Sequence, residues 1–292
     1  MIFFEQGVFR AGTYLNTAMM SFCSLITKEG MLHLENRFSQ FCNEIERLSD
    51  SERKDFKILT KKQILSIFLM PNYLHYLDNF QTPDEYNKPG NSSVIYEIGC
   101  ATGATFDIRY LHETLYSDSE LIYTTMQNYD LKDIIVRRHP GDPTQSNFLQ
   151  YSTKKAYDDS HNATEFILKC KRIASTGSNV SIEAAFWGRT PYVLTSCGAY
   201  NKTLHNLKIK EEQLVDDLYL NWYAFSFLFP REFYFDYDYM TYRLSNPPEI
   251  ELYNKNLDYY LKQSRIRRSL LEIEPEESVK KIRELRALTV ME

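Results

Sequence analysis

The sequence is short of cysteine and has no surplus of positive charge. Its five cysteines are odd in number and widely spaced, and none forms a Cys-x-x-Cys pair. This pattern predicts neither a disulfide framework nor a zinc site, and it fits a reducing cytoplasm best. The formal net charge of -5 argues against general nucleic-acid binding, because that binding needs many lysines and arginines to displace counterions from phosphates.

Long apolar runs are missing as well. No uninterrupted apolar run approaches the length needed to cross a bilayer, and Glu5 interrupts the apolar start of the chain before a signal-peptide core could form. The carboxyl-terminal helical pattern mixes arginines and lysines with glutamates, which is typical of a solvated helix face. We therefore expect a cytoplasmic protein with at most peripheral contact with the inner face of the membrane.

The sequence does contain short apolar runs that alternate with helical patterns. After residue 93 this alternation indicates an α/β fold, with a parallel sheet connected by helical crossovers and ligands bound at the carboxyl ends of its strands. The predicted strands are 1–4, 94–98, 134–136, 173–174 and 191–194. The predicted helices are 36–48, 61–77, 181–187 and 249 to the end.

A cluster of turn-forming residues in 81–93 marks a domain boundary, because proline, glycine and asparagine favour turns over regular structure. This boundary divides the chain into a segment of strands and helices at 1–88 and a sheet-containing lobe at 89–207. An aromatic and helical carboxyl-terminal extension follows at 208–292.

The predicted strand at 134–136 ends in two arginines, His139 and Pro140. Proline removes a backbone donor and fixes φ, so the strand stops there and the imidazole is held at the edge of the sheet. His139 can then donate a hydrogen bond to a phosphate or ribose oxygen. A surface loop with an incidental histidine is the alternative.

The predicted strand at 173–174 runs through a serine-rich turn into the predicted helix at 181–187. The first turn of a helix offers free N–H groups, which bind phosphate together with small hydroxyls and the positive helix end. Glu183 is a carboxylate inside this helix that could hold ribose hydroxyls. An ordinary helix cap uses the same residue types without a ligand, and it stays open as the alternative. The candidate phosphate-binding residues are Ser175, Thr176, Gly177, Ser178 and Asn179.

These two segments resemble the capsule-polysaccharide-biosynthesis glycosyltransferases, including the Kdo-transferase type, and more distantly the bacterial sialyltransferases and polysialyltransferases. The His-Pro motif of those families matches His139 and Pro140. Their Ser/Thr motif matches 178–184, with Asn and Ser replacing Thr and Gly. Their acidic-glycine motif is similar to the segment that begins at Glu5, with Gln6 replacing the second acid.

The resemblance implies a GT-B fold, in which two Rossmann-like lobes enclose the active site. The nucleotide-binding lobe would be 89–207, and the amino-terminal lobe would be incomplete. An incomplete lobe leaves open the alternative that this chain alone has no activity. The implied reaction transfers a CMP-activated acidic sugar such as Kdo or sialic acid to a surface polysaccharide or glycolipid acceptor. Glu5 would be the general base and His139 would act at the leaving phosphate. No Asp-x-Asp motif occurs where the nucleotide would bind, so we expect neither a metal nor a further cofactor.

Two other functions remain open. The segment 95–103 also resembles the glycine-rich first motif of S-adenosylmethionine-dependent methyltransferases, although no acidic residue clearly ends a second strand about twenty residues further on, as ribose binding would require. The incomplete amino-terminal lobe also fits a non-catalytic subunit of a polysaccharide-synthesis complex. Other polysaccharide-synthesis proteins would then be its partners.

Overall fold

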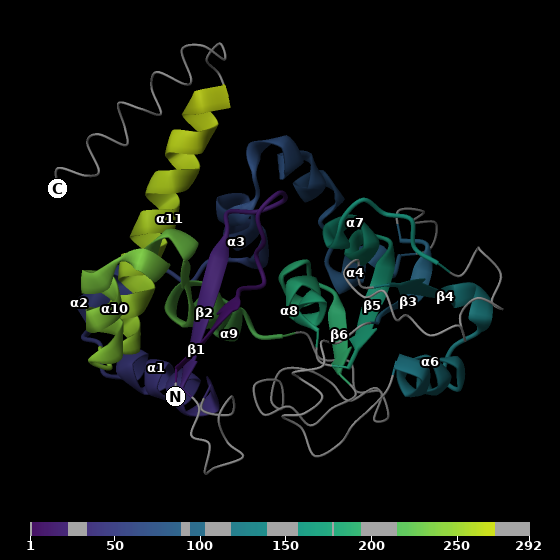
Figure 1. The fold of residues 1–292 in the computed structure, drawn as a ribbon, viewed down its shortest axis with the longest axis horizontal. Helices are drawn as coiled ribbons and strands as arrows, with labels where there is room; N and C mark the ends of the chain where they lie inside the picture. The colour runs from purple at the N-terminus through teal and green to yellow at the C-terminus, as the bar shows by residue number, and fades with distance from the viewer. Residues whose placement is uncertain are drawn as a thin grey trace.

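The computed structural model describes residues 2–22, 34–88, 94–102, 118–138, 157–176, 178–193 and 215–271. The fold is α/β, as the alternating pattern predicts. Figure 1 shows a parallel sheet on one side of the molecule, and an antiparallel sheet on the other beside the long helix α11 (Glu249–Leu271).

The predicted parallel sheet is confirmed. Its strands are β3 (Tyr96–Ala101), β4 (Ile134–Arg137), β5 (Cys170–Ser175) and β6 (Thr190–Val193), in the order β4-β3-β5-β6. Every neighbouring pair is parallel, so all four carboxyl ends lie at one edge, as in a Rossmann-like fold.

Gly99 allows the central strand β3 to pack closely against helix α7 (Ala163–Leu168). A Cβ atom added at Gly99 would lie 2.6 Å from Cζ of Phe166 and 2.7 Å from Sγ of Cys170. The missing side chain at Gly99 therefore serves packing between the sheet and α7.

The antiparallel sheet joins the two ends of the described chain. Strands β1 (Ile2–Gln6), β2 (Thr17–Phe22) and β7 (Leu228–Pro230) lie in the order β1-β2-β7. This pairing differs from the parallel sheet expected of a Rossmann-like amino-terminal lobe. The predicted domain limits stay predictions, but the segments before residue 88 and after residue 215 share this sheet.

Helices surround both sheets. Helices α7 and α8 (Asn179–Phe186) pack against β5, and α8 also contacts α3 (Lys61–Phe68). Among the described residues, the remaining α-helices are α1 (Leu34–Glu46), α2 (Asp50–Asp55), α4 (Pro83–Tyr86), α6 (Asp118–Met126), α9 (Asp217–Trp222) and α10 (Tyr237–Leu244). The same residues include the 3-10 segments η1 (Pro71–Asn79), η2 (Leu131–Asp133) and η7 (Arg231–Phe235), and the π-helix η6 (Tyr223–Phe227).

The predicted helix at 61–77 is wrong in its second half. Helix α3 ends at Phe68, and a 3-10 helix begins at Pro71. Proline has no N–H to donate and disfavours helical geometry in the residue before it, so Met70 is extended. This break turns η1 toward α7, where the Tyr76 hydroxyl donates to Glu165 at 2.7 Å.

A single aromatic core connects the antiparallel sheet with α7 and α8. Phe9, from the loop between β1 and β2, stacks on Phe68 of α3 at a centroid distance of 4.1 Å and also contacts Phe186 of α8. Buried Glu249, at the start of α11, accepts hydrogen bonds from Trp222 and Ser226. The contacts of Phe9 fix the loop between β1 and β2 against α3 and α8.

No helix in the described ranges combines the length and the apolar character needed to cross a bilayer.

Candidate functional site

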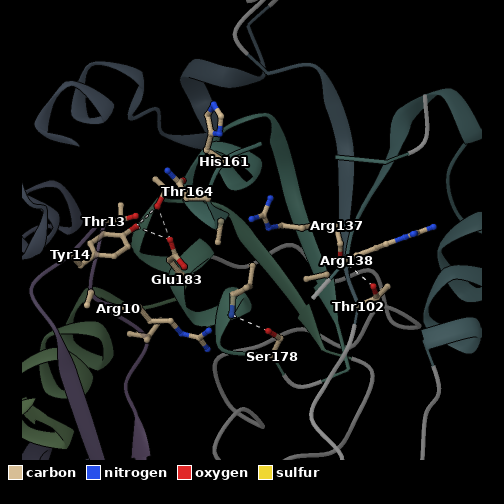
Figure 2. A pocket seen from close by; sticks show the side chains of 16 residues that line it. Arg10, Thr13, Tyr14, Thr102, Arg137, Arg138, His161, Thr164, Ser178 and Glu183 are labelled. Atoms are coloured by element: carbon tan, nitrogen blue, oxygen red, sulfur yellow. Dashed lines mark hydrogen bonds between the residues drawn. The ribbon is translucent and has the colours of Figure 1, made fainter. Parts of the chain in front are cut away.

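A cavity of about 250 Å³ opens at the carboxyl edge of the parallel sheet. Its walls come from the ends of β3 and β4, the starts of α7 and α8, and the loop between β1 and β2, as Figure 2 shows. The loop between β1 and β2 thus forms one wall of a cavity whose other walls belong to the parallel sheet and its helices. This edge is where sheets of this type bind their ligands.

Three arginines give the cavity a positive charge. Arg10 comes from the loop after β1, and Arg137 and Arg138 come from the end of β4. In Figure 2 the side chains of Arg10 and Arg137 extend toward each other across the cavity, while Arg138 extends away. In the described part of the chain, Arg10 and Arg138 form no ion pair with a carboxylate.

Arg137 and Arg138 are held by different contacts. The Arg137 guanidinium donates to buried Asp158 at 2.5 Å and to the backbone oxygen of Ser160 at 3.1 Å. The Arg138 guanidinium lies 4.0 Å from the ring centroid of Tyr157, a cation–π contact. Arg137 is therefore oriented by its ion pair, and Arg138 by its contact with Tyr157.

The start of α8 brings the positive end of a helix to the same cavity. Ser178 is the N-cap of α8 and lines the cavity, and its hydroxyl accepts from the backbone N–H of Val180 at 3.3 Å. The first N–H groups of a helix and its positive end favour a negative ligand. The cavity therefore combines arginine side chains with a helix N-terminus, a common arrangement for holding a phosphate group.

Glu183 lines the cavity as part of a buried cluster. Its Oε1 accepts from the Tyr14 hydroxyl at 2.7 Å and from the Thr164 hydroxyl at 2.8 Å. Burial raises the pKa of the Glu183 carboxyl, although these hydrogen bonds and the charges of Arg10 and Arg137 oppose the shift. Glu183 is therefore a carboxyl group among positive groups, suited to accepting hydrogen bonds from ligand hydroxyls.

Only some residues of the predicted phosphate-binding segment line the cavity. Ser178 and Glu183 meet in the cavity, but Ser175 is fully buried behind the turn. Its Oγ lies 2.6 Å from the Oγ of Ser181 and accepts from the backbone N–H of Ser178. Ser175 therefore stabilises the turn from the inside.

The other predicted residues lie at the border of this site or outside the described residues. Thr176 is buried, and Asn179 is half-buried without lining the cavity. Glu5 pairs with Met19 in the antiparallel sheet through its backbone. The remaining three candidates, His139, Pro140 and Gly177, lie outside the described residues.

No family model and no curated protein matches this chain. The glycosyltransferase resemblance therefore stays a prediction from its motifs. Within the described ranges there is also no group of three or more His, Cys, Asp or Glu side chains arranged to hold a metal ion.

Sequence reasoning missed several residues of the cavity. Arg10 and Arg137 both belong to segments that the motifs single out, and their charge was the available signal for an anion site. Tyr14 and Thr164 carried no such signal, because they reach Glu183 only after folding from positions 169 and 19 residues away along the chain.

Proposed function

We propose that this chain is a glycosyltransferase of GT-B type that binds a nucleotide-activated sugar, with CMP as the nucleotide, in the cavity at the carboxyl edge of the parallel sheet. The convergence of Arg10, Arg137 and the start of α8 on one cavity supports this proposal most directly. The phosphate would lie between these positive groups, and Glu183 would accept hydrogen bonds from hydroxyls of the ligand.

The same arrangement suits stabilisation of a leaving group. When the bond between sugar and phosphate breaks, negative charge grows on the phosphate oxygens. Donors already in place around that phosphate stabilise the transition state without reorganising. The proposed mechanism assigns this role to Arg10, Arg137 and the positive end of α8, so the leaving phosphate needs no metal ion.

Nucleotide binding tests the proposal. CMP, UDP and S-adenosylmethionine would be titrated at fixed ionic strength and followed by calorimetry and thermal unfolding. We expect CMP to bind and to raise the melting temperature. Arg10→Gln should weaken CMP binding at least about tenfold, because one hydrogen bond to a charged group contributes about 1.5–3 kcal/mol.

Arg47→Gln is the matched control, since Arg47 is an exposed arginine outside the cavity and its loss should leave CMP affinity unchanged. Stabilisation by S-adenosylmethionine alone would replace this proposal with a methyltransferase. If none of the three ligands binds, a non-catalytic subunit of a polysaccharide-synthesis complex is favoured instead.

The catalytic roles of Glu5 and His139 need a transfer assay with a CMP-linked sugar and an oligosaccharide or glycolipid acceptor. Glu5→Gln should lower turnover while CMP affinity stays near the wild-type value, since a general base acts on the acceptor. His139→Ala should lower both. Normal turnover in either variant removes that residue from the mechanism.

A further inference from the structure

The hydrogen bonds around Glu183 form a closed arrangement of three oxygen atoms. The Tyr14 hydroxyl lies 2.7 Å from Glu183 Oε1 and 2.7 Å from Thr164 Oγ1, and Thr164 Oγ1 lies 2.8 Å from the same carboxylate oxygen. The indole N–H of Trp187 donates to the Tyr14 oxygen at 3.0 Å. The Tyr14 hydroxyl donates to Glu183, so the phenol oxygen accepts from Trp187 while its hydrogen is shared with the carboxylate.

Each member of this arrangement comes from a different part of the fold. Tyr14 lies in the loop between β1 and β2, Thr164 in α7, and Glu183 and Trp187 in and directly after α8. Tyr14 is 3% exposed and Thr164 is 1% exposed, so water does not compete for these hydrogen bonds. Figure 2 shows Tyr14 and Thr164 on the far side of Glu183 from Arg137 and Ser178.

We propose that Tyr14 is a positioning residue for the nucleotide site, which together with Thr164 holds the Glu183 carboxylate ionised and in one orientation for the hydroxyl groups of the ligand. The inference rests on the proposed function, because its main test measures nucleotide binding. A buried carboxyl group without these donors would take up a proton more readily and would rotate more freely.

The titratable and charged groups around Glu183 come from three walls of the cavity. Arg10 on the loop and Arg137 at the end of β4 favour its ionised form, and the charge of Arg137 is shared with Asp158. His161, just before α7, also lines the cavity. Burial favours the neutral form, so loss of one donor moves the pKa of Glu183 further upward.

The test is the pH dependence of CMP affinity in wild type, Tyr14→Phe and Glu183→Gln. We expect wild-type affinity to rise with pH as Glu183 ionises. Tyr14→Phe should weaken CMP binding about tenfold at pH 7, corresponding to one lost hydrogen bond to a charged group, and should move the rise to higher pH. Glu183→Gln should keep only the rise that comes from the second ionisation of the CMP phosphate, which has a pKa of about 6.

Thr164→Val and Thr164→Ser provide a second pair, in case Tyr14→Phe unfolds the chain. The valine variant should reproduce the shift to higher pH, and the serine variant, which keeps the hydroxyl, should restore the wild-type profile. Tyr253→Phe is the matched control, because the buried Tyr253 hydroxyl donates to the backbone oxygen of Lys57 away from the cavity. It should change stability but leave the pH profile of binding unchanged.

The outcomes separate the two proposals. If wild-type protein binds no CMP, the proposed function fails, and this inference fails with it. If wild type binds CMP but Tyr14→Phe and Thr164→Val keep the wild-type pH profile, only the positioning role is overturned. An infrared titration of the Glu183 carboxyl in ligand-free protein gives an independent check, since it should move to higher pH in Tyr14→Phe.

Discussion

Substitution of Gly99 tests how the sheet positions the cavity. An alanine Cβ at this position would lie 2.6 Å from Cζ of Phe166 and 2.7 Å from Sγ of Cys170. Both neighbours are fully buried, so neither side chain can move into solvent. The strand or α7 must therefore shift to relieve the overlap, because a packed interior has little free space.

The expected cost of Gly99→Ala follows from this overlap. Overpacking of a well-packed core costs about 1–3 kcal/mol, and we expect a loss of that size in the free energy of unfolding measured by urea denaturation. CMP affinity should fall as well, since Phe166 belongs to α7, and α7 also carries Thr164 at the cavity. Nucleotide binding and stability would thus change together.

A double-mutant cycle identifies the cause. Phe166→Leu removes the outer atoms of the ring, so Gly99→Ala should cost at least about 0.5 kcal/mol less in that background than in wild type. Gly12→Ala is the contrast, because Gly12 has a φ of 106° and no atom within 4 Å of the added Cβ. Its cost is backbone strain, which the Phe166→Leu substitution cannot relieve. A Gly99→Ala variant as stable as wild type, or equally destabilised with and without Phe166→Leu, would refute the packing argument.

Three further predictions concern buried and paired groups. Glu249→Ala should lower the free energy of unfolding by about 3–5 kcal/mol in urea, because it leaves the buried Trp222 indole N–H and the half-buried Arg37 guanidinium without their acceptor. Burial raises the pKa of Cys100 to about 12 and that of Cys170 well above its usual range. Neither thiol should therefore react with iodoacetamide in the native protein at pH 8. Peptide mass mapping that finds either cysteine labelled before unfolding contradicts this prediction. Burial opposes ionisation of Glu97, but its hydrogen-bonded lysine and arginine partners lower its pKa, so its stabilising contribution is present at neutral pH and is lost as the pH falls. Unfolding curves of Glu97→Gln should therefore lose less stability on acidification than those of wild type.

Local patterns in the sequence predict the parallel lobe well. The β-branched run at 134–136 becomes β4, and the run at 173–174 lies within β5, because short apolar strands need burial on both faces whatever surrounds them. The serine at 178 is an N-cap, as its residue type favours. Pro71 marks the end of the α-helical segment within 61–77. The apolar spacing did not predict this end, because it does not depend on whether a residue has a backbone N–H.

Only part of the candidate site could be predicted from these local patterns. Ser178 and Glu183 could be proposed because strand tips of a parallel sheet share an edge. That Ser175 faces inward depends on the rotation of the turn, which the sequence pattern leaves open.

The sequence by itself determined the four strands of the parallel sheet and the charge at the end of β4, because these depend on residues that are close neighbours along the chain. Only the tertiary structure decided that β2 pairs with β7, and that Arg10 and Tyr14 reach a cavity formed mainly by residues more than eighty positions further on. Such contacts depend on how whole elements pack, and the aromatic core that sets this packing gathers residues from both ends of the described chain.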